Sequence, residues 1–146
     1  MPKFTFRLQS YLELKEKMED SRKAEYGRAM ADLAAKREEE TRLVNERVGV
    51  TAKFRGSILQ GIHPYEAKRF SDYLASLKES ITMQQKIVAE AEKEVEIRRL
   101  SLVEAMRERK ALGTLRDKRY EEYLEEQKSA EQKQTDEIVS YRTAKR

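Results

Sequence analysis

The sequence predicts an all-α chain that folds as a long antiparallel two-helix coiled-coil hairpin, with the C-terminal helix overhanging the N-terminal one. Three observations support this prediction: a strong apolar heptad repeat in the second half of the chain, a weaker one in the first half, and turn-forming residues between them. We expect a single elongated hairpin domain over residues 1–146, with a first arm at about 4–55, a turn at about 56–64 and a second arm at about 65–142.

The first arm carries a sparse stripe whose spacing alternates between four and three residues. Its members are Tyr26, Met30, Leu33, Arg37 and Val44. This spacing is typical of a helix that packs against one partner helix along a narrow face.

The turn is predicted from residues that favour a chain reversal. Gly56, Ser57 and Gly61 precede Pro64. Glycine permits positive φ, and proline suits the first turn of a helix because its missing N–H has no helical partner there. The only histidine, His63, is expected to be an exposed side chain in this loop.

The second arm carries the stronger repeat. Residues seven positions apart are Leu74, Ile81, Val88, Val95 and Leu102, and between them lie Phe70, Leu77, Gln84, Ala91 and Arg98. A repeat sustained in this way keeps one stripe facing a partner helix and predicts a coiled coil.

The two stripes match if the chain folds back between Gln60 and Gly61. The predicted apolar pairs are Tyr26 with Val95, Met30 with Ala91, Leu33 with Val88 and Val44 with Leu77. The same register brings together Arg37, Glu40 and Gln84, which would form either one polar layer that fixes the register or a weak, hydrated stretch.

The second arm is expected to outrun the first. At a rise of about 1.5 Å per residue the arms would measure roughly 75 Å and 120 Å. We therefore predict that residues beyond about Tyr120 have no intramolecular partner. Charge also changes there: residues 98–119 are mainly basic and residues 121–137 mainly acidic, which indicates either a charged partner or a solvated flank.

Composition argues against catalysis. The chain has 40% charged residues, no Cys and no Trp, so it can build a narrow helical interface but no broad core with a concave catalytic pocket. No phosphate-binding loop or metal-ligand cluster is present, and we predict a non-enzyme without cofactor or metal. We find no signal peptide or membrane-spanning run in the sequence, and expect a cytoplasmic protein.

Two segments resemble the flagellar export protein family called FliJ. They are the opening FTFRLQSYLELKEKMED and the segment GIHPYEAKRFSDYLASLKESI after the turn. The resemblance implies a stalk-like component of the bacterial flagellar type III export apparatus. Its implied partners are the hexameric export ATPase, whose assembly or activity it promotes, the cytoplasmic domain of the export gate, and the export chaperones. The implied location is the cytoplasmic face of the inner membrane, with membrane association only through partners and no bound nucleic acid.

The resemblance also implies two binding surfaces. Matching the family's gate-contact stripe to this sequence gives Leu43, Val50, Tyr73, Leu77, Ser80 and Gln84. For the lumen of the ATPase ring, our hypothesis is residues 98–146 with the N-terminal face, in particular Leu8, Leu12, Arg109, Arg116, Arg119 and Tyr123.

Two alternatives remain at this point. A basic coiled-coil arm could bind structured RNA through phosphate contacts, although 27 acidic residues are interleaved with 31 basic ones. A generic coiled-coil scaffold or chaperone would show the same periodicity.

Overall fold

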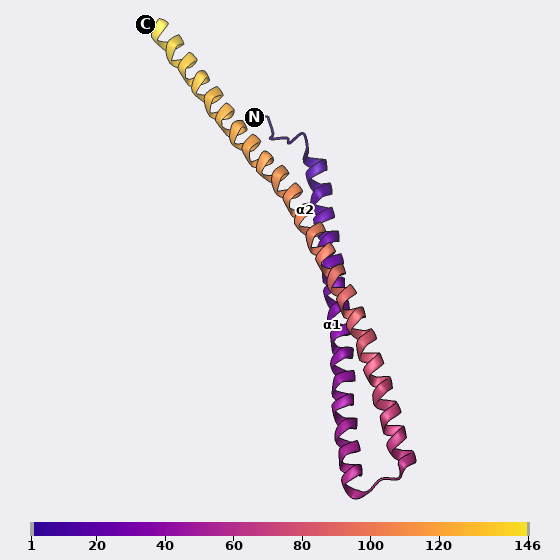
Figure 1. Cartoon of the computed structure of the whole chain (residues 1–146). Coiled ribbons are helices and arrows are strands. Elements are labelled where there is room, and N and C mark those ends of the chain that lie inside the picture. Colours follow the sequence, from indigo (N-terminus) through magenta and orange to yellow (C-terminus); the bar gives the residue numbers. More distant parts are fainter. Residues whose placement is uncertain (1, 146) are drawn as a thin grey trace. The chain divides into compact units, whose positions relative to one another are not determined.

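The computed structural model describes residues 2–145 and contains two helices. Helix α1 spans Gln9–Gln60, with 52 residues, and helix α2 spans Pro64–Ala144, with 81 residues (Figure 1). The described part of the chain has no strand, which confirms the all-α hairpin. The bounds of the first helix differ from the expected arm of about 4–55. Helix α1 begins at Gln9 and continues through Gly56 as far as Gln60.

The turn consists of three residues, and each end is closed by a backbone or side-chain bond. Gly61 has φ 86°, a left-handed conformation that ends α1. The His63 carbonyl accepts hydrogen bonds from the N–H groups of Glu66 and Ala67, at 2.9 and 3.1 Å. His63 Nδ1 accepts a further bond from the Tyr65 N–H at 3.2 Å. His63 is therefore the N-cap of α2, and Pro64 occupies the first helical position as predicted.

Contacts divide the chain into two units, and each contains part of both helices. Unit 1 holds the residues up to Ser21 and those from Val103 onward, and unit 2 is Arg22–Leu102. In unit 2, every predicted stripe position of the second arm is buried or partly buried. The apolar side chains form two clusters, one of Leu33, Val88, Ala91 and Val95, and one of Leu43, Leu77, Ile81, Val50 and Leu74.

The predicted stripe of the first arm was partly wrong. Met30 and Val44 are exposed, with fractional exposures of 49% and 40%, whereas Leu43 packs against Leu77 in place of Val44. The pairing of Leu33 with Val88 is confirmed. The predicted stripe of the first arm differs from the observed one because the inward face of α1 also contains polar residues such as Lys36. The methylene stem of Lys36 can cover apolar surface while its charge reaches water.

The predicted polar layer of Arg37, Glu40 and Gln84 does not form. Gln84 Nε2 donates to the Lys36 carbonyl at 2.9 Å, and Arg37 instead pairs with Glu92 at 3.1 Å. Both bonds still connect α1 to α2. The polar contacts between the helices of unit 2 are thus separate and do not form one layer.

Candidate functional site

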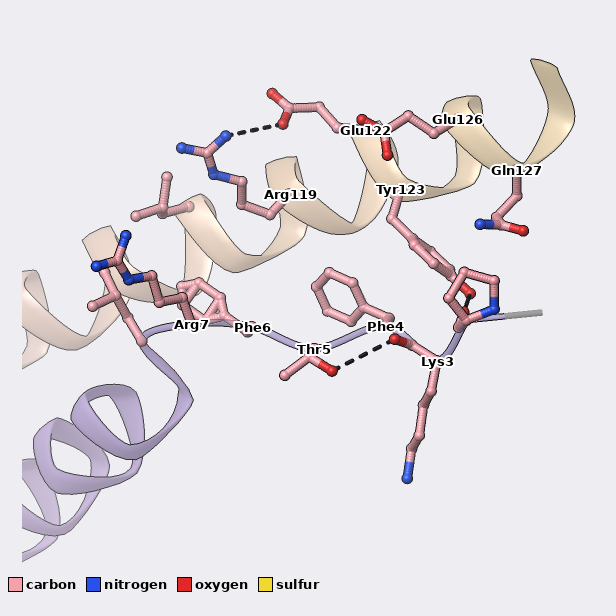
Figure 2. Close-up of a pocket in the computed structure, with 13 residues that line it drawn as sticks. Lys3, Phe4, Thr5, Phe6, Arg7, Arg119, Glu122, Tyr123, Glu126 and Gln127 are labelled. Carbon is pink, nitrogen blue, oxygen red and sulfur yellow. Dashed lines mark hydrogen bonds and ion pairs between the residues drawn. The ribbon is translucent and has the colours of Figure 1, made fainter. Parts of the chain in front are cut away.

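Residues 2–8 precede α1 and lie along α2, held there by aromatic contacts within unit 1 (Figure 2). The Phe4 ring lies 5.1 Å from the Tyr120 ring and 5.5 Å from the Tyr123 ring, measured between centroids. Its contact with Tyr120 has the edge-to-face geometry that aromatic quadrupoles favour. The Tyr123 hydroxyl donates a hydrogen bond to the Pro2 carbonyl, and Phe6 is buried.

A groove of about 820 Å³ opens between this segment and α2. Figure 2 shows the Phe4 ring directed from the N-terminal segment toward α2, and the Tyr123 side chain directed from α2 toward this segment. The residues that line it are Pro2, Lys3, Phe4, Thr5, Phe6, Arg7, Leu8, Leu115, Arg119, Glu122, Tyr123, Glu126 and Gln127. The aromatic and aliphatic surface of the groove is therefore bordered by charges of both signs. This arrangement is suited to binding the surface of another protein.

Two ion pairs connect the two helices of unit 1, and each helix also buries one apolar residue in this unit. Glu19 is buried, with 5% of its surface exposed, and its Oε2 lies 2.6 Å from Arg109 Nε. This hydrogen bond raises the pKa of Arg109. Lys15 Nζ lies 2.7 Å from Glu108 Oε2, which raises the pKa of Lys15. Leu12 of α1 and Ala105 of α2 are also buried.

The prediction that residues beyond about Tyr120 lack an intramolecular partner was wrong. Tyr120 and Tyr123 contact Phe4, and Gln127 still lines the groove. The reason is that residues 2–8 are not helical, so they can span up to about 3.3–3.6 Å per residue instead of about 1.5 Å. The fully exposed part of α2 begins only at residue 128 and continues to the end of the helix at Ala144.

The hypothetical ring-binding residues fall into two groups within unit 1. Leu8, Arg119 and Tyr123 line the groove. The other three make internal contacts. Leu12 is buried, Arg109 pairs with Glu19, and Arg116 donates to Gln9 Oε1 at 3.1 Å while its guanidinium lies over the Phe4 ring.

The hypothetical gate-binding residues also differ in accessibility, here within unit 2. Leu43 and Leu77 are buried, Val50 packs against them, and Gln84 bonds to α1. Ser80 and Tyr73 are exposed. The Tyr73 hydroxyl donates to the Glu46 carboxylate, and this bond raises the pKa of Tyr73.

A second groove, of about 790 Å³, lies near the turn in unit 2. Its lining consists of Val50, Lys53, Glu66, Arg69, Phe70, Asp72 and Tyr73. Phe70 also packs against Phe54 of α1, with 5.1 Å between ring centroids. Tyr73 is thus the one gate-binding candidate that is both exposed and part of a groove.

Sequence reasoning missed Phe4, Phe6 and Tyr120 as members of a site. The signal was the alternation of two phenylalanines around Thr5, which is unusual for a helix start and places both rings on one side of an extended segment. Glu19 was also missed, because a buried carboxylate cannot be distinguished from a solvated one by periodicity alone.

Within residues 2–145, no group of three or more His, Cys, Asp or Glu side chains converges on a point where a metal ion could be held. Neither of the two described helices combines the length and apolar character needed to cross a membrane.

Comparison with known proteins assigns the family. The family model described as Flagellar FliJ protein matches residues 4–146. Neither the curated proteins nor the solved structures that were compared gave a match. Because the family match spans nearly the whole chain, the chain belongs to the flagellar FliJ protein family and is a non-enzymatic component of the flagellar export apparatus.

Proposed function

We propose that this protein binds the hexameric export ATPase through unit 1, promotes its assembly or activity, and contacts the cytoplasmic domain of the export gate through unit 2. It would also carry export chaperones and act in the cytoplasm, at the inner face of the inner membrane. The observation that carries the proposal is in unit 1. There an open aromatic groove is followed along α2 by a helical segment that has no covering element within its unit.

The exposed segment of α2 has the composition of a surface that binds another protein. Ile138, Val139 and Tyr141 expose 54%, 56% and 62% of their surface. Residues 121–137 are mainly acidic, which would complement a basic partner surface and steer its approach. Covering exposed apolar side chains with a partner surface is energetically favourable. We therefore assign ring binding to this segment.

For the gate, the accessible candidates are Tyr73 and Ser80. Tyrosine is enriched among residues that dominate binding energy at protein interfaces. The second groove places Tyr73 beside Lys53 and Arg69 and also beside Glu66 and Asp72. A gate surface that carries charges of both signs would therefore find complementary groups next to an aromatic anchor. Leu43 and Leu77 would act indirectly, by holding the α1 and α2 surfaces in register.

Deleting residues 128–146 tests the ATPase part of the proposal. This truncation leaves Tyr123 and Gln127 in place, so the groove and the hairpin should keep their helicity by circular dichroism. We expect stimulation of the export ATPase to be lost. A truncated protein that is helical and still stimulates the ATPase fully would contradict the proposal.

Replacing Tyr73 tests the gate part. Tyr73→Ala should weaken capture of a gate cytoplasmic fragment by about tenfold or more, as for other interface anchors, while ATPase stimulation stays unchanged. Tyr65→Ala is the matched control, since Tyr65 is also an exposed tyrosine near the turn but does not line the second groove. Equal effects of both substitutions would count against a specific role for Tyr73.

The RNA-binding alternative is not favoured by the ion pairs of the basic block. Arg98, Arg99, Arg109 and Arg119 each pair with a glutamate within the chain. Cations that are already paired have less to gain from phosphate contacts.

A further inference from the structure

The end of the hairpin in unit 2 exposes aliphatic and aromatic side chains that the proposed function does not use. Ile58 and Leu59 lie in the last turn of α1, and Tyr65 lies in the first turn of α2 (Figure 1). They expose 51%, 88% and 67% of their surface. Leu59 has the largest exposed fraction among the large apolar residues of the chain that the structure describes. We define these three residues as the apolar tip.

The apolar tip lies within the longest stretch of the chain without an acidic residue. Residues 47–65 contain no Asp or Glu, although the chain has 27 acidic residues in total. The cations of this stretch are Arg47, Lys53 and Arg55, and Lys68 and Arg69 follow in the first turns of α2. The only carboxylates close behind the tip on α2 are Glu66 and Asp72. We define Lys53, Arg55, Lys68 and Arg69 as the basic collar.

The collar cations are exposed and have no internal partner. Among residues 2–145, no ion pair involves Lys53, Arg55, Lys68 or Arg69. This contrasts with the basic block of residues 98–119, in which several arginines are paired with glutamates. The positive charge near the turn is therefore available to an external anion.

We propose that the apolar tip inserts into the headgroup region of an anionic lipid membrane, with the basic collar bound to lipid phosphates. Lys53 lies six residues before Leu59 on α1, which is about 9 Å along the helix at 1.5 Å per residue. Lys68 lies three residues after Tyr65 on α2, or about 4.5 Å. Interfacial segments bury their apolar side chains about 5–10 Å into the boundary between headgroups and acyl chains. The spacing therefore places the cations at phosphate depth when the tip residues reach the acyl boundary.

The other classes of partner explain fewer of these observations. A nucleic acid would use the collar but leave aliphatic Ile58 and Leu59 in water. An acidic protein would need a matching apolar pocket as well as negative charge. An anionic bilayer supplies both the negative surface and the apolar layer, and tyrosine is favoured at this interface. Contact of this kind would attach the protein directly to the membrane, and not only through its partners.

A tryptophan reporter tests the proposal, because the chain has no Trp of its own. Leu59→Trp provides a single tryptophan at the tip of the full-length chain, which can be excited selectively over the seven tyrosines. With vesicles of phosphatidylglycerol and phosphatidylcholine at low salt, its emission should shift to shorter wavelength and rise in intensity. Pure phosphatidylcholine vesicles should give a much smaller change. Ile138→Trp, on the exposed C-terminal segment, is the matched control and should not respond.

Substitutions in the collar test the electrostatic part. A cation near an anionic bilayer is worth about fivefold in binding, so adding Lys53→Gln with Arg55→Gln to the reporter chain should lower the vesicle partition coefficient about 25-fold. Arg107→Gln with Lys110→Gln, also exposed, should leave it unchanged. Ile58→Ser with Leu59→Ser in the chain without the reporter should abolish cosedimentation with the vesicles. Ile97→Ser with Leu100→Ser, which are similarly exposed, should not.

Three results would overturn the proposal. The first is an unshifted Leu59→Trp spectrum with anionic vesicles at low salt. The second is a vesicle-free blue shift that grows with protein concentration, which would assign the tip to a second copy of the chain. The third is an RNA-induced shift that depends on Lys53 and Arg55 while vesicles cause none, which would assign the collar to nucleic acid.

Discussion

Arg109 Nε lies 2.6 Å from Glu19 Oε2, and Glu19 is the one charged side chain in unit 1 that is buried among the described residues. The pair connects α1 to α2 within unit 1, where Leu12 of α1 and Ala105 of α2 are also buried. A charged pair at such positions costs desolvation energy but can specify register.

Removing one member of this pair should destabilise unit 1 more than removing both. Arg109→Leu takes the guanidinium away from a buried carboxylate, so the melting temperature should fall. Glu19→Leu combined with Arg109→Leu continues the apolar stripe and should restore or exceed the original value. Circular dichroism melts of the single and double variants measure this. Equal losses in both would contradict the interpretation.

The corrected register of α1 can be tested with two neighbouring residues. Leu33→Ala should reduce the free energy of unfolding by about 2–4 kcal/mol, because it leaves a cavity next to Val88 and Ala91. Met30→Ala, at an exposed position, should change it by less than about 0.5 kcal/mol. Urea unfolding followed by circular dichroism distinguishes these values. Similar costs for the two would support the register predicted from sequence instead.

The turn offers a matched pair of glycines. Gly61 has φ 86°, whereas Gly56 lies inside α1, and a Cβ at either position would meet no atom within 4 Å. Gly61→Ala should therefore destabilise the protein by about 1–2 kcal/mol through backbone strain alone. Gly56→Ala should stabilise it by up to about 1 kcal/mol. Chemical unfolding of both variants, under identical conditions, checks the opposite signs.

The segment of residues 2–8 should detach without unfolding the helices when Phe4 is truncated. Phe4→Ala removes the ring that contacts Tyr120 and Tyr123, which we expect to cost about 1–2 kcal/mol of local stability. Hydrogen exchange of residues 2–8 should accelerate, and the circular dichroism spectrum should not change. Tyr141→Ala, in the exposed segment, is the control and should leave exchange in residues 2–8 unaffected.

Acid should weaken the helices through two surface carboxylates. Hydrogen bonds from Arg42 and Arg99 lower the pKa values of Glu39 and Glu96 below the ordinary 4.5. Since the folded-state pKa is lowered, the stabilisation is present above pH 4.5 and is lost as the pH falls through the lowered values. Thermal melts between pH 6 and pH 3 should show this decrease. A chain with Glu39→Gln and Glu96→Gln should lose less stability over that interval.

The fold class and the stripe of α2 could be predicted from the sequence because their signals are local. A repeat from Phe70 to Leu102 sets which face of α2 is buried, whatever its partner. Pro64 and Gly61 fixed the turn through their own backbone preferences. The stripe of α1 was predicted less well, since Lys36 and Glu19 on its inward face are polar and give no periodic apolar signal.

The candidate sites depended on the tertiary structure for a different reason. Whether Tyr123 has a partner is decided by how far residues 2–8 reach. This depends on their being non-helical, and the heptad pattern of the two arms carries no information about it. Likewise, Leu43 and Val44 are adjacent and similarly apolar, and only packing against Leu77 determines which one is buried. The sequence by itself therefore determined that two helices pair around a turn, because helical periodicity and turn chemistry are properties of neighbouring residues. Only the tertiary structure decided which side chains remain available to partners, because availability depends on contacts between residues far apart in the chain.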